Sequence, residues 1–241
     1  MNIWCTCIIP FYNEEERILS VLQTLAEIKQ LTHIIVVDDG STDHGAKIVQ
    51  QYCLQHTHIS LISYPNNAWK SHAVYIGLQE VTTPYVLLFD ADLFDIKKEE
   101  IILMIENMQY NSEIDMGILR RISSDWYIKL FYRELILSGQ RMLRTQDLKD
   151  AFAATSINRY QLEVAINMYM KHHKKLTLRY PFSAENTFKH KKRWFRYWWK
   201  RDILMFRDIF SYGGFASFCK QILLFKPKKF TTYPLQQSAH R

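Results

Sequence analysis

Several features that mark secreted, membrane-spanning and fibrous proteins are scarce or missing in this chain of 241 residues. It contains only 7 Gly, 6 Pro and 4 Cys, and the cysteines form no Cys-x-x-Cys pair, so we expect neither a disulfide framework nor a zinc site. No run of 18 apolar residues occurs, because charged side chains interrupt the most apolar stretch, 203–225, and we expect no membrane span. The first residues lack the pattern of a signal peptide. These absences predict a cytoplasmic protein.

The overall composition is that of an ordinary folded protein. Hydrophobic residues make up 48% of the chain and charged residues 23%, which excludes a disordered or collagen-like protein. Because Gly and Pro are so few, there is little room for linkers. We therefore expect one domain over residues 1–185, followed by an extension over residues 186–241.

The formal net charge of +7 is distributed unevenly along the chain. Residues 186–230 contain 12 Lys and Arg but only 2 Asp and Glu, together with 13 of the 34 aromatic residues. Residues 1–185 carry a net charge of −4. Basic and aromatic segments bind single-stranded nucleic acid in some proteins, but an acidic body argues against such a partner. We expect no nucleic acid, and a partner surface that is both anionic and apolar.

The first 90 residues alternate between strand and helix patterns. Strands are expected at 4–9, 34–37, 59–62 and 85–89, and helices at 14–30, 46–54 and 71–80. The strands are apolar throughout rather than alternating, which is typical of strands buried on both faces. The pattern predicts an α/β fold with a Rossmann-like, open and mostly parallel sheet that is covered by helices on both faces.

The second half of residues 1–185 has a looser pattern. We expect helices at 97–109, 126–137 and 160–173, with strands at 115–119 and 176–180.

Acidic residues follow three of the predicted strands, at the sheet edge where such folds bind ligands. They are Glu14 after the first strand, Asp38 and Asp39 after the second, and Asp90 and Asp92 after the fourth. Asp90 and Asp92 are one residue apart and could both reach one hard cation, for which oxygen ligands favour Mg²⁺ or Mn²⁺. The cation would hold a diphosphate and absorb charge as a nucleoside diphosphate departs. Asp38 and Asp39 could accept hydrogen bonds from a ribose and a base. Either pair could instead cap a turn or a helix.

Three motifs give this chain a family resemblance. They are Cys7 to Glu14 (CIIPFYNE), Ile35 to Asp43 (IVVDDGSTD) and Leu87 to Leu93 (LLFDADL). Together they resemble the nucleotide-binding half of family 2 glycosyltransferases with the GT-A fold. Two further elements, 67–73 with Gly77 and 138–141 with Glu163, resemble the dolichol-phosphate-mannose-synthase-like members. The resemblance covers residues 5–182, and it divides the domain into a nucleotide-sugar-binding half, 1–95, and an acceptor half, 96–185.

The resemblance implies roles for individual residues. The residues implied to bind the nucleotide sugar are Pro10, Tyr12 and Glu14 around the base, Asp38 and Asp39 at base and ribose, and Lys70, Asp90 and Ala91. The residues implied to take part in catalysis are Asp92, Glu163 and Arg141, the last near the sugar or the acceptor phosphate. Asp90 and Asp92 are the implied ligands of Mg²⁺ or Mn²⁺.

The chain departs from the family pattern at two places. Trp69 and Ser71 replace the glycines that flank the family lysine, so this loop is bulkier. Phe94 stands where dolichol-type enzymes have a Gln that can help to hold the metal, and Phe cannot be a ligand. Asp95 is the nearest possible replacement.

The expected function is an inverting glycosyltransferase that uses a UDP- or GDP-linked sugar. A polyprenyl phosphate is the favoured acceptor, because a phosphate is already ionised and needs no general base. A hydroxyl of a saccharide or lipid, in cell-envelope glycan synthesis, is the alternative. It requires a base, for which Glu163, Asp147 and Asp125 are candidates, although Glu163 could instead be a structural carboxylate paired with Arg159 or a distant Arg. The alternative of another class is a catalytically dead nucleotide- and membrane-binding protein.

The extension after residue 186 predicts attachment to a membrane surface. On a helical projection of 189–210 the aromatic side chains gather on one side and the Lys and Arg side chains mainly on the other, which is typical of an interfacial helix. Gly213 and Gly214 allow a turn, 215–225 could return as a second apolar helix, and Lys226 to Lys229 would end the pair. We therefore expect a peripheral protein on the inner face of an anionic membrane. Packing of the aromatic residues on the core is the alternative.

Overall fold

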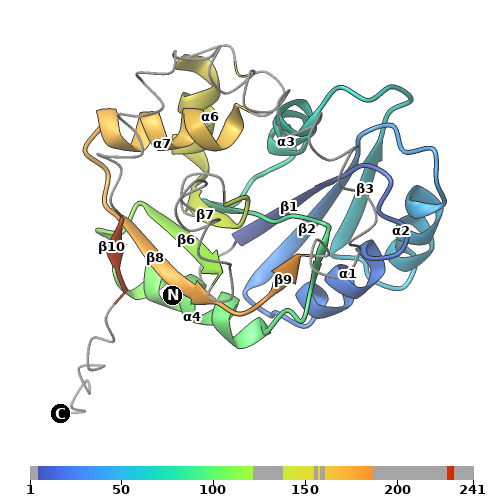
Figure 1. Ribbon diagram of the computed structural model, residues 1–241, viewed down its shortest axis with the longest axis horizontal. Coiled ribbons are helices and arrows are strands. Elements are labelled where there is room, and N and C mark those ends of the chain that lie inside the picture. Colours follow the sequence, from blue (N-terminus) through green and yellow to red (C-terminus); the bar gives the residue numbers. More distant parts are fainter. Residues whose placement is uncertain (1–4, 122–137, 155–156, 158–160, 187–226, 231–241) are drawn as a thin grey trace, which may run out of the picture.

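A computed structural model describes residues 5–121, 138–154, 157, 161–186 and 227–230. These residues form one eight-stranded sheet, a two-stranded ribbon and six helices (Figure 1). The order in the large sheet is β10-β8-β6-β7-β4-β1-β2-β3. Five of its seven strand pairings are parallel, so the predicted α/β fold with a mostly parallel sheet is confirmed.

The first half alternates between strands and helices as the sequence predicts. Its elements are β1 (Cys5–Phe11), α1 (Ile18–Ala26), β2 (Leu31–Asp38), α2 (Gly45–Cys53), β3 (Ile59–Ser63), α3 (Lys70–Gln79) and β4 (Tyr85–Leu88). Strand β1 pairs in parallel with both β2 and β4, and β2 pairs in parallel with β3. The expected start of the first helix at Glu14 is wrong, because α1 begins at Ile18 and residues 14–17 form a turn that precedes it. Glu14 therefore lies in a loop at the carboxyl edge of the sheet.

The second half contains more elements than the sequence predicts. Its elements are β5 (Leu93–Phe94), α4 (Lys98–Tyr110), β6 (Met116–Arg121), β7 (Arg141–Arg144), α6 (Thr145–Ala154), α7 (Leu162–His172), β8 (Thr177–Phe182), β9 (Glu185–Asn186) and β10 (Lys228–Lys229). The strands β5, β7 and β9 and the helix α6 were not expected. Strand β7 is antiparallel to its neighbours β4 and β6. The four residues of β7 have an arginine at each end and show no strand pattern in the sequence. This segment is a strand because it pairs with β4 and β6 on its two sides.

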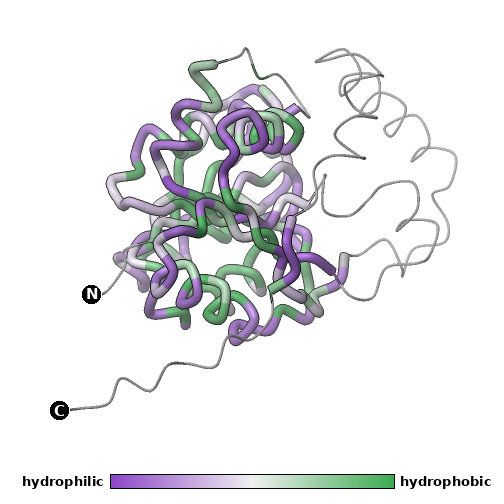
Figure 2. Tube along the Cα trace, turned by 90° about the vertical axis from the view of Figure 1, so that its left-hand side faces the viewer, coloured by the Kyte–Doolittle hydropathy of each residue, from purple (hydrophilic) through white to green (hydrophobic). Residues whose placement is uncertain are grey.

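Two apolar layers cover the two faces of the sheet, as predicted. Alternate residues of one strand point into different layers: Cys7 and Ile9 pack with α1, α2 and α4, whereas Ile8 packs with α3, α6 and α7. Figure 1 shows α3, α6 and α7 on the opposite side of the sheet from α1 and α4. In Figure 2 the green, hydrophobic segments are most frequent in the middle of the molecule, and purple, hydrophilic segments are most frequent around them. Because the strands are buried on both faces, the polar loops at their ends are the places left for chemistry.

A short piece of the predicted extension belongs to the sheet. Lys228 and Lys229 pair in parallel with Leu178 and Arg179 of β8. The ring of Phe230 stacks on Tyr180 at 4.9 Å between ring centroids. Residues 228–229 of the predicted Lys226 to Lys229 segment therefore form an edge strand, which the sequence did not predict.

Three other expected helices fall outside the described residues. They are the helix at 126–137 and the two interfacial helices at 189–210 and 215–225. None of the described helices has both the length and the apolar character that crossing a bilayer requires.

Candidate active site

The ends of β1 and β2 meet at the carboxyl edge of the sheet, where they place Asp38 and Asp39. The backbone N–H of Asp39 donates to the carbonyl oxygen of Phe11 at 2.9 Å, which joins the two strand ends. Both aspartates are buried, at 4% and 3% exposure. Neighbouring groups bond to both carboxylates, so these side chains are positioned before any ligand arrives.

The carboxylate of Asp38 accepts from Ser41 N at 2.9 Å and from Ser63 Oγ at 2.6 Å. Asp39 Oδ1 accepts from Tyr64 Oη and from Ala68 N, each at 2.7 Å. Burial, followed by the hydrogen bond and charge of Asp39, raises the pKa of Tyr64, which keeps this phenol protonated as a donor.

The loop after β1 is fastened to the loop after β2. The N–H of Asn13 donates to Ser41 Oγ at 3.0 Å, and Asn13 Oδ1 accepts from the N–H of Thr42 at 2.8 Å. Pro10 lies within β1, where it pairs with Val37 of β2. Tyr12 follows β1 and is 43% exposed. The structure thus brings the expected base-pocket residues to one end of the sheet.

Gly40 makes this loop arrangement possible. Its φ of +72° lies in the region that favours glycine. A Cβ at this position would come within 2.7 Å of both Asn66 C and Asn67 N. The backbone that follows the two aspartates therefore packs directly against the loop before α3.

Glu14 lies close to carboxylates of two other loops. Burial raises its pKa to about 7; the partner Arg17 opposes the rise, while the charges of Asp92 and Asp43 add to it. The side chains of Glu14 and Arg17 are hydrogen-bonded. Carboxylates from the loops after β1, β2 and β4 are therefore close enough to influence one another, and this place favours a cation.

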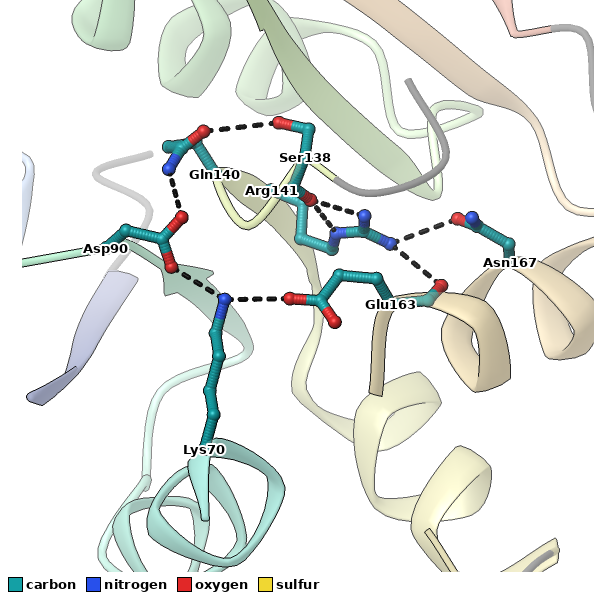
Figure 3. Close-up of polar contacts among 7 residues, drawn as sticks. All are labelled: Lys70, Asp90, Ser138, Gln140, Arg141, Glu163 and Asn167. Atoms are coloured by element: carbon teal, nitrogen blue, oxygen red, sulfur yellow. Dashed lines mark hydrogen bonds and ion pairs between the residues drawn. The ribbon is translucent and has the colours of Figure 1, made fainter. Parts of the chain in front are cut away.

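Lys70 joins the two halves of the predicted domain at one atom (Figure 3). Its Nζ lies 2.6 Å from Asp90 Oδ1, at the end of β4, and 2.7 Å from Glu163 Oε1, on α7. Burial lowers the pKa of Lys70, but the two carboxylates outweigh it and raise the pKa above its ordinary value. The ammonium group therefore stays charged. The carboxylate of Glu163 contacts this lysine, while Arg159, one arginine that the sequence suggested as its partner, lies outside the described residues.

Asp90 is enclosed on several sides. Its Oδ2 accepts from Gln140 Nε2 at 2.5 Å, while its Oδ1 accepts from Lys70. A Cβ on Gly139 would fall 2.2 Å from Oδ2. Only glycine leaves room for this carboxylate, so the loop before β7 fits closely around the first aspartate of the Asp-x-Asp motif.

Arg141 lies behind this cluster. The side chain is completely buried. Its guanidinium donates to Ser138 O at 2.9 Å, to Glu163 O at 3.3 Å and to Asn167 Oδ1 at 3.0 Å. Burial lowers its pKa to about 10, against the opposing charges of Glu163 and Asp90. In this arrangement Arg141 holds α7 against the loop that carries Gln140, and its contact with a sugar or acceptor phosphate stays a prediction.

Asp147, another candidate base, is not part of this cluster. Asp147, on α6, is buried and lies 3.3 Å from Lys175 Nζ and 3.3 Å from Tyr169 Oη. Its contacts fix α6 to α7 and to the segment before β8. Asp125 lies outside the described residues.

The carboxylates after β4 fit a hard divalent cation. Within the described residues no group of three or more His, Cys, Asp or Glu side chains forms a complete metal cage. Mg²⁺ commonly needs only one or two carboxylates, because substrate phosphates and waters complete its coordination. Asp90 and Asp92, beside the charge of Glu14, match that donor set. The neighbouring Phe94 offers no ligand atom, and Asp95 is exposed with a φ of 54°.

The sequence reasoning missed several residues of the site. Gln140 and Gly139 surround Asp90, and Ser63 and Tyr64 hold the two aspartates after β2. Ser63 is the last residue of β3 and Tyr64 follows it, so the rule that locates ligands at strand ends could have found them. Gln140 lies in the element 138–141, which contributes to the family resemblance, but nothing in the sequence indicates its contact with Asp90.

A comparison with protein-family models decides the family. The model described as glycosyl transferase family 2 matches residues 6–168, which include the edge loops, Lys70 and Glu163. The chain belongs to glycosyl transferase family 2. The prediction of a family 2 glycosyltransferase is thereby confirmed at the level of the family.

Curated relatives of this family 2 glycosyltransferase match part of its length. A dolichyl-phosphate beta-glucosyltransferase, ALG5C, of Trichomonas vaginalis is 35% identical over 100 residues, which is 38% of this chain and 30% of the relative. A 4,4'-diaponeurosporenoate glycosyltransferase of Staphylococcus aureus is 32% identical over 116 residues, which is 47% of this chain and 30% of the relative. The match thus spans less than one third of either relative.

Solved structures of low sequence identity share the fold of this family 2 glycosyltransferase. Glucosyl-3-phosphoglycerate synthase from Mycobacterium tuberculosis, in complex with Mn²⁺, uridine diphosphate and phosphoglyceric acid, has a TM-score of 0.66 at 15% identity. The alignment covers 88% of this chain and 79% of the synthase. Another crystal structure of the synthase contains Mn²⁺ and UDP-glucose, with a TM-score of 0.63 at 15% identity and a coverage of 87% of this chain and 78% of the synthase. This likeness establishes the GT-A-like fold.

Proposed function

We propose that this protein is an inverting glycosyltransferase that transfers a sugar from a nucleoside-diphosphate sugar to a polyprenyl phosphate at a membrane surface. One observation carries the proposal: Lys70 binds Asp90 of the nucleotide-sugar-binding half and Glu163 of the acceptor half with the same ammonium group. A donor and an acceptor would meet at this cation.

The donor would lie along the carboxyl edge. Asp38 and Asp39 would hold the ribose and the base, with Pro10, Tyr12 and Glu14 around the base. The diphosphate would extend toward Lys70 and the loop of Asp90, Ala91 and Asp92. Support comes from the positions of these loops, which the contacts Asn13–Ser41 and Asp39–Ala68 bring together.

Mg²⁺ or Mn²⁺ would be held by Asp90 and Asp92. Both oxygens of Asp90 accept hydrogen bonds, from Lys70 and Gln140, so the cation would compete with these donors for Asp90. When bound, the cation neutralises charge on the departing diphosphate. The positive charge of Lys70 would act on the same phosphates once a donor is present.

The contacts of Glu163 favour a phosphate acceptor. A phosphate oxygen can attack the anomeric carbon without losing a proton, whereas a hydroxyl needs a base. The carboxylate of Glu163 is already paired with Lys70 at 2.7 Å, so abstracting a proton would compete with this ion pair. The name of the Trichomonas vaginalis relative, a dolichyl-phosphate glucosyltransferase, agrees with an acceptor of this class.

Transfer to a hydroxyl of a saccharide or lipid is the second candidate. The position of Glu163 at the junction of the two halves favours it, because a base in that place could reach an acceptor hydroxyl if Lys70 moved to the donor phosphates. In that case Glu163 would be indispensable.

The extension over residues 186–241 would bind the anionic inner face of a membrane. The described strand β9 ends at Asn186 and pairs with Leu93 and Phe94, directly after Asp92. Asn186, the last described residue before the basic and aromatic segment, therefore lies beside the proposed metal loop. This position suits an acceptor that is presented from a lipid surface.

The test is release of nucleoside diphosphate from a panel of UDP- and GDP-sugars, with Mn²⁺, in the presence and absence of vesicles that contain a polyprenyl phosphate. We expect release that depends on the polyprenyl phosphate and stops with a chelator. Release with a saccharide alone would favour the second candidate. If no donor gives release above background, the protein is a catalytically dead nucleotide- and membrane-binding protein and the proposal fails.

A further inference from the structure

Trp69, the residue before Lys70, has a backbone conformation that normally belongs to glycine. Its φ is 76° and its ψ is 156°, a combination that is essentially closed to residues with a Cβ and costs free energy where it occurs. The other described residues with positive φ, glycines apart, are Asn13, Asp95 and Lys174, with φ of 54° or 55°. Among these four, Trp69 is the one bulky aromatic residue, and for such a side chain positive φ is a true outlier.

Contacts on both sides hold this backbone in place. The preceding N–H, of Ala68, donates to Asp39 Oδ1 at 2.7 Å. The carbonyl oxygen of Trp69 accepts from the N–H groups of His72 at 3.0 Å and Ala73 at 3.1 Å, which begins α3. The next side chain, Lys70, is tied to two carboxylates. The conformation at residue 69 is therefore imposed by the site itself.

A glycine would adopt this conformation without strain, yet residue 69 is a tryptophan, the largest type of side chain. The indole is not fully buried: 36% of Trp69 is exposed. Strained residues persist mainly where the strain serves a ligand site. The position therefore calls for a function of the indole that outweighs its cost to the backbone.

We propose that the indole of Trp69 packs against the apolar C–H face of the donor's sugar ring and so helps to select the donor. This inference rests on the proposed function. Residue 69 lies between Asp39, at the nucleoside end of the donor path, and Lys70, at the diphosphate and acceptor end. The other exposed aromatic of this edge, Tyr12, follows β1 beside the Ser41 loop, which is the nucleoside end. Aromatic side chains combined with a few placed polar groups are typical of small-molecule sites.

The test compares a nucleotide sugar with the matching nucleotide. Calorimetry measures how tightly the full chain binds UDP-glucose and UDP, each with Mn²⁺, in wild type, Trp69→Gly and Trp69→Phe. If the release assay selects a GDP-sugar as the donor, that GDP-sugar and GDP are used instead. In Trp69→Gly we expect the nucleotide sugar to bind about tenfold more weakly and the nucleoside diphosphate to change by less than about twofold. Trp69→Phe should recover most of the loss, because a second aromatic ring can pack on the same sugar face.

Equal weakening of both ligands, or no change in either, would overturn the role in sugar selection while leaving the proposed function in place. A wild-type chain that binds no UDP- or GDP-sugar would overturn the proposed function, and this inference with it.

A second measurement tests the strained backbone independently of any ligand. Trp69→Gly and Trp69→Ala both remove the indole, but only glycine relaxes the backbone. We expect Trp69→Gly to melt about 2 to 4 °C above Trp69→Ala. At the exposed helical position Gln51 the order should be the reverse, with Gln51→Ala above Gln51→Gly. An alanine variant at residue 69 that melts at or above the glycine variant would show that the backbone is not strained and would overturn the inference.

Discussion

The Nζ atom of Lys70 lies 2.7 Å from Oε1 of Glu163, although 93 residues separate them in the chain. Lys70 begins α3 and Glu163 lies in the first turn of α7. They belong to the halves that we propose bind the nucleotide sugar and the acceptor, respectively. The same ammonium also binds Asp90. A change of charge on either side of the site is therefore felt on the other.

The variant Glu163→Gln separates the two candidate functions. With a polyprenyl phosphate as acceptor, we expect turnover within about tenfold of wild type, since a general base contributes about 10²- to 10⁴-fold where one is used. We also expect the nucleoside diphosphate to bind more tightly, because Lys70 loses one of its two competing carboxylates. Steady-state kinetics and calorimetry measure the two effects.

A larger loss in Glu163→Gln, together with loss of the acidic limb of the pH profile, would identify Glu163 as a base and favour a hydroxyl acceptor. The exposed Glu113, in the turn after α4, provides the control variant Glu113→Gln.

Replacing Lys70 by Met should destabilise the protein. Two carboxylates that bond to one nitrogen would face each other without a cation, which we expect to cost about 1 to 3 kcal/mol. Adding Glu163→Gln to this variant removes one of the two charges, so the deficit should shrink. Urea unfolding of the single and the double variant measures it. A deficit that is the same in both would contradict the charge explanation, and Lys98→Met, at an exposed ion pair with Glu27, should unfold like wild type.

Substituting Asp92 by Asn should abolish turnover without unfolding the protein. Loss of the charge that holds the cation at the diphosphate is worth several kcal/mol of barrier, so we expect a decrease of at least about 10³-fold. Mn²⁺ binding in the presence of UDP, measured by electron paramagnetic resonance, should be lost as well. Asp150→Asn, on α6, is the matched control. Normal Mn²⁺ binding by the Asp92 variant would refute the role of Asp92 as a metal ligand.

Glu14 should make stability depend on pH between 4.5 and about 7. Its pKa rises from the ordinary value of 4.5 to about 7 on folding, so the folded protein binds this proton more tightly than the unfolded chain. Stability is therefore gained as the pH falls through this range and lost as it rises. We expect Glu14→Gln to remove up to about 2 kcal/mol of the dependence, after allowance for solvent screening. Parallel curves for wild type and variant from pH 5 to 8 would contradict this.

Charge in the extension should control binding to anionic vesicles. The variant replaces Lys191, Lys192, Arg193 and Arg196 by Gln in the full chain and so keeps the strand at 228–229. Each charge near an anionic surface contributes about 1 kcal/mol, so cosedimentation with anionic vesicles should fall sharply. A control that replaces the exposed body lysines Lys29, Lys47, Lys97 and Lys149 should cosediment like wild type. Equal binding by both variants would refute attachment through the extension.

Local patterns in the sequence were sufficient for the first half of the fold. Apolar strands that end at Asp38 and near Asp90, separated by amphipathic helices, predict parallel βαβ units and hence the edge where ligands bind. The motifs at these strand ends also indicated the family. Such predictions succeed because each element's pattern is carried by consecutive residues, and parallel strands leave few possible arrangements.

The sequence by itself thus determined the fold class, the edge that carries the site and the residue types available there for a cation and a nucleotide. Only the tertiary structure decided which of them meet. Strand β7 exists because β4 and β6 flank it, Arg141 is buried because α7 covers it, and Glu163 is paired because Lys70 reaches it across the sheet edge. The conformation of Trp69 likewise follows from contacts with Asp39 and with the start of α3. These partners are distant in sequence, and their contacts depend on packing of the whole chain, which no local pattern records.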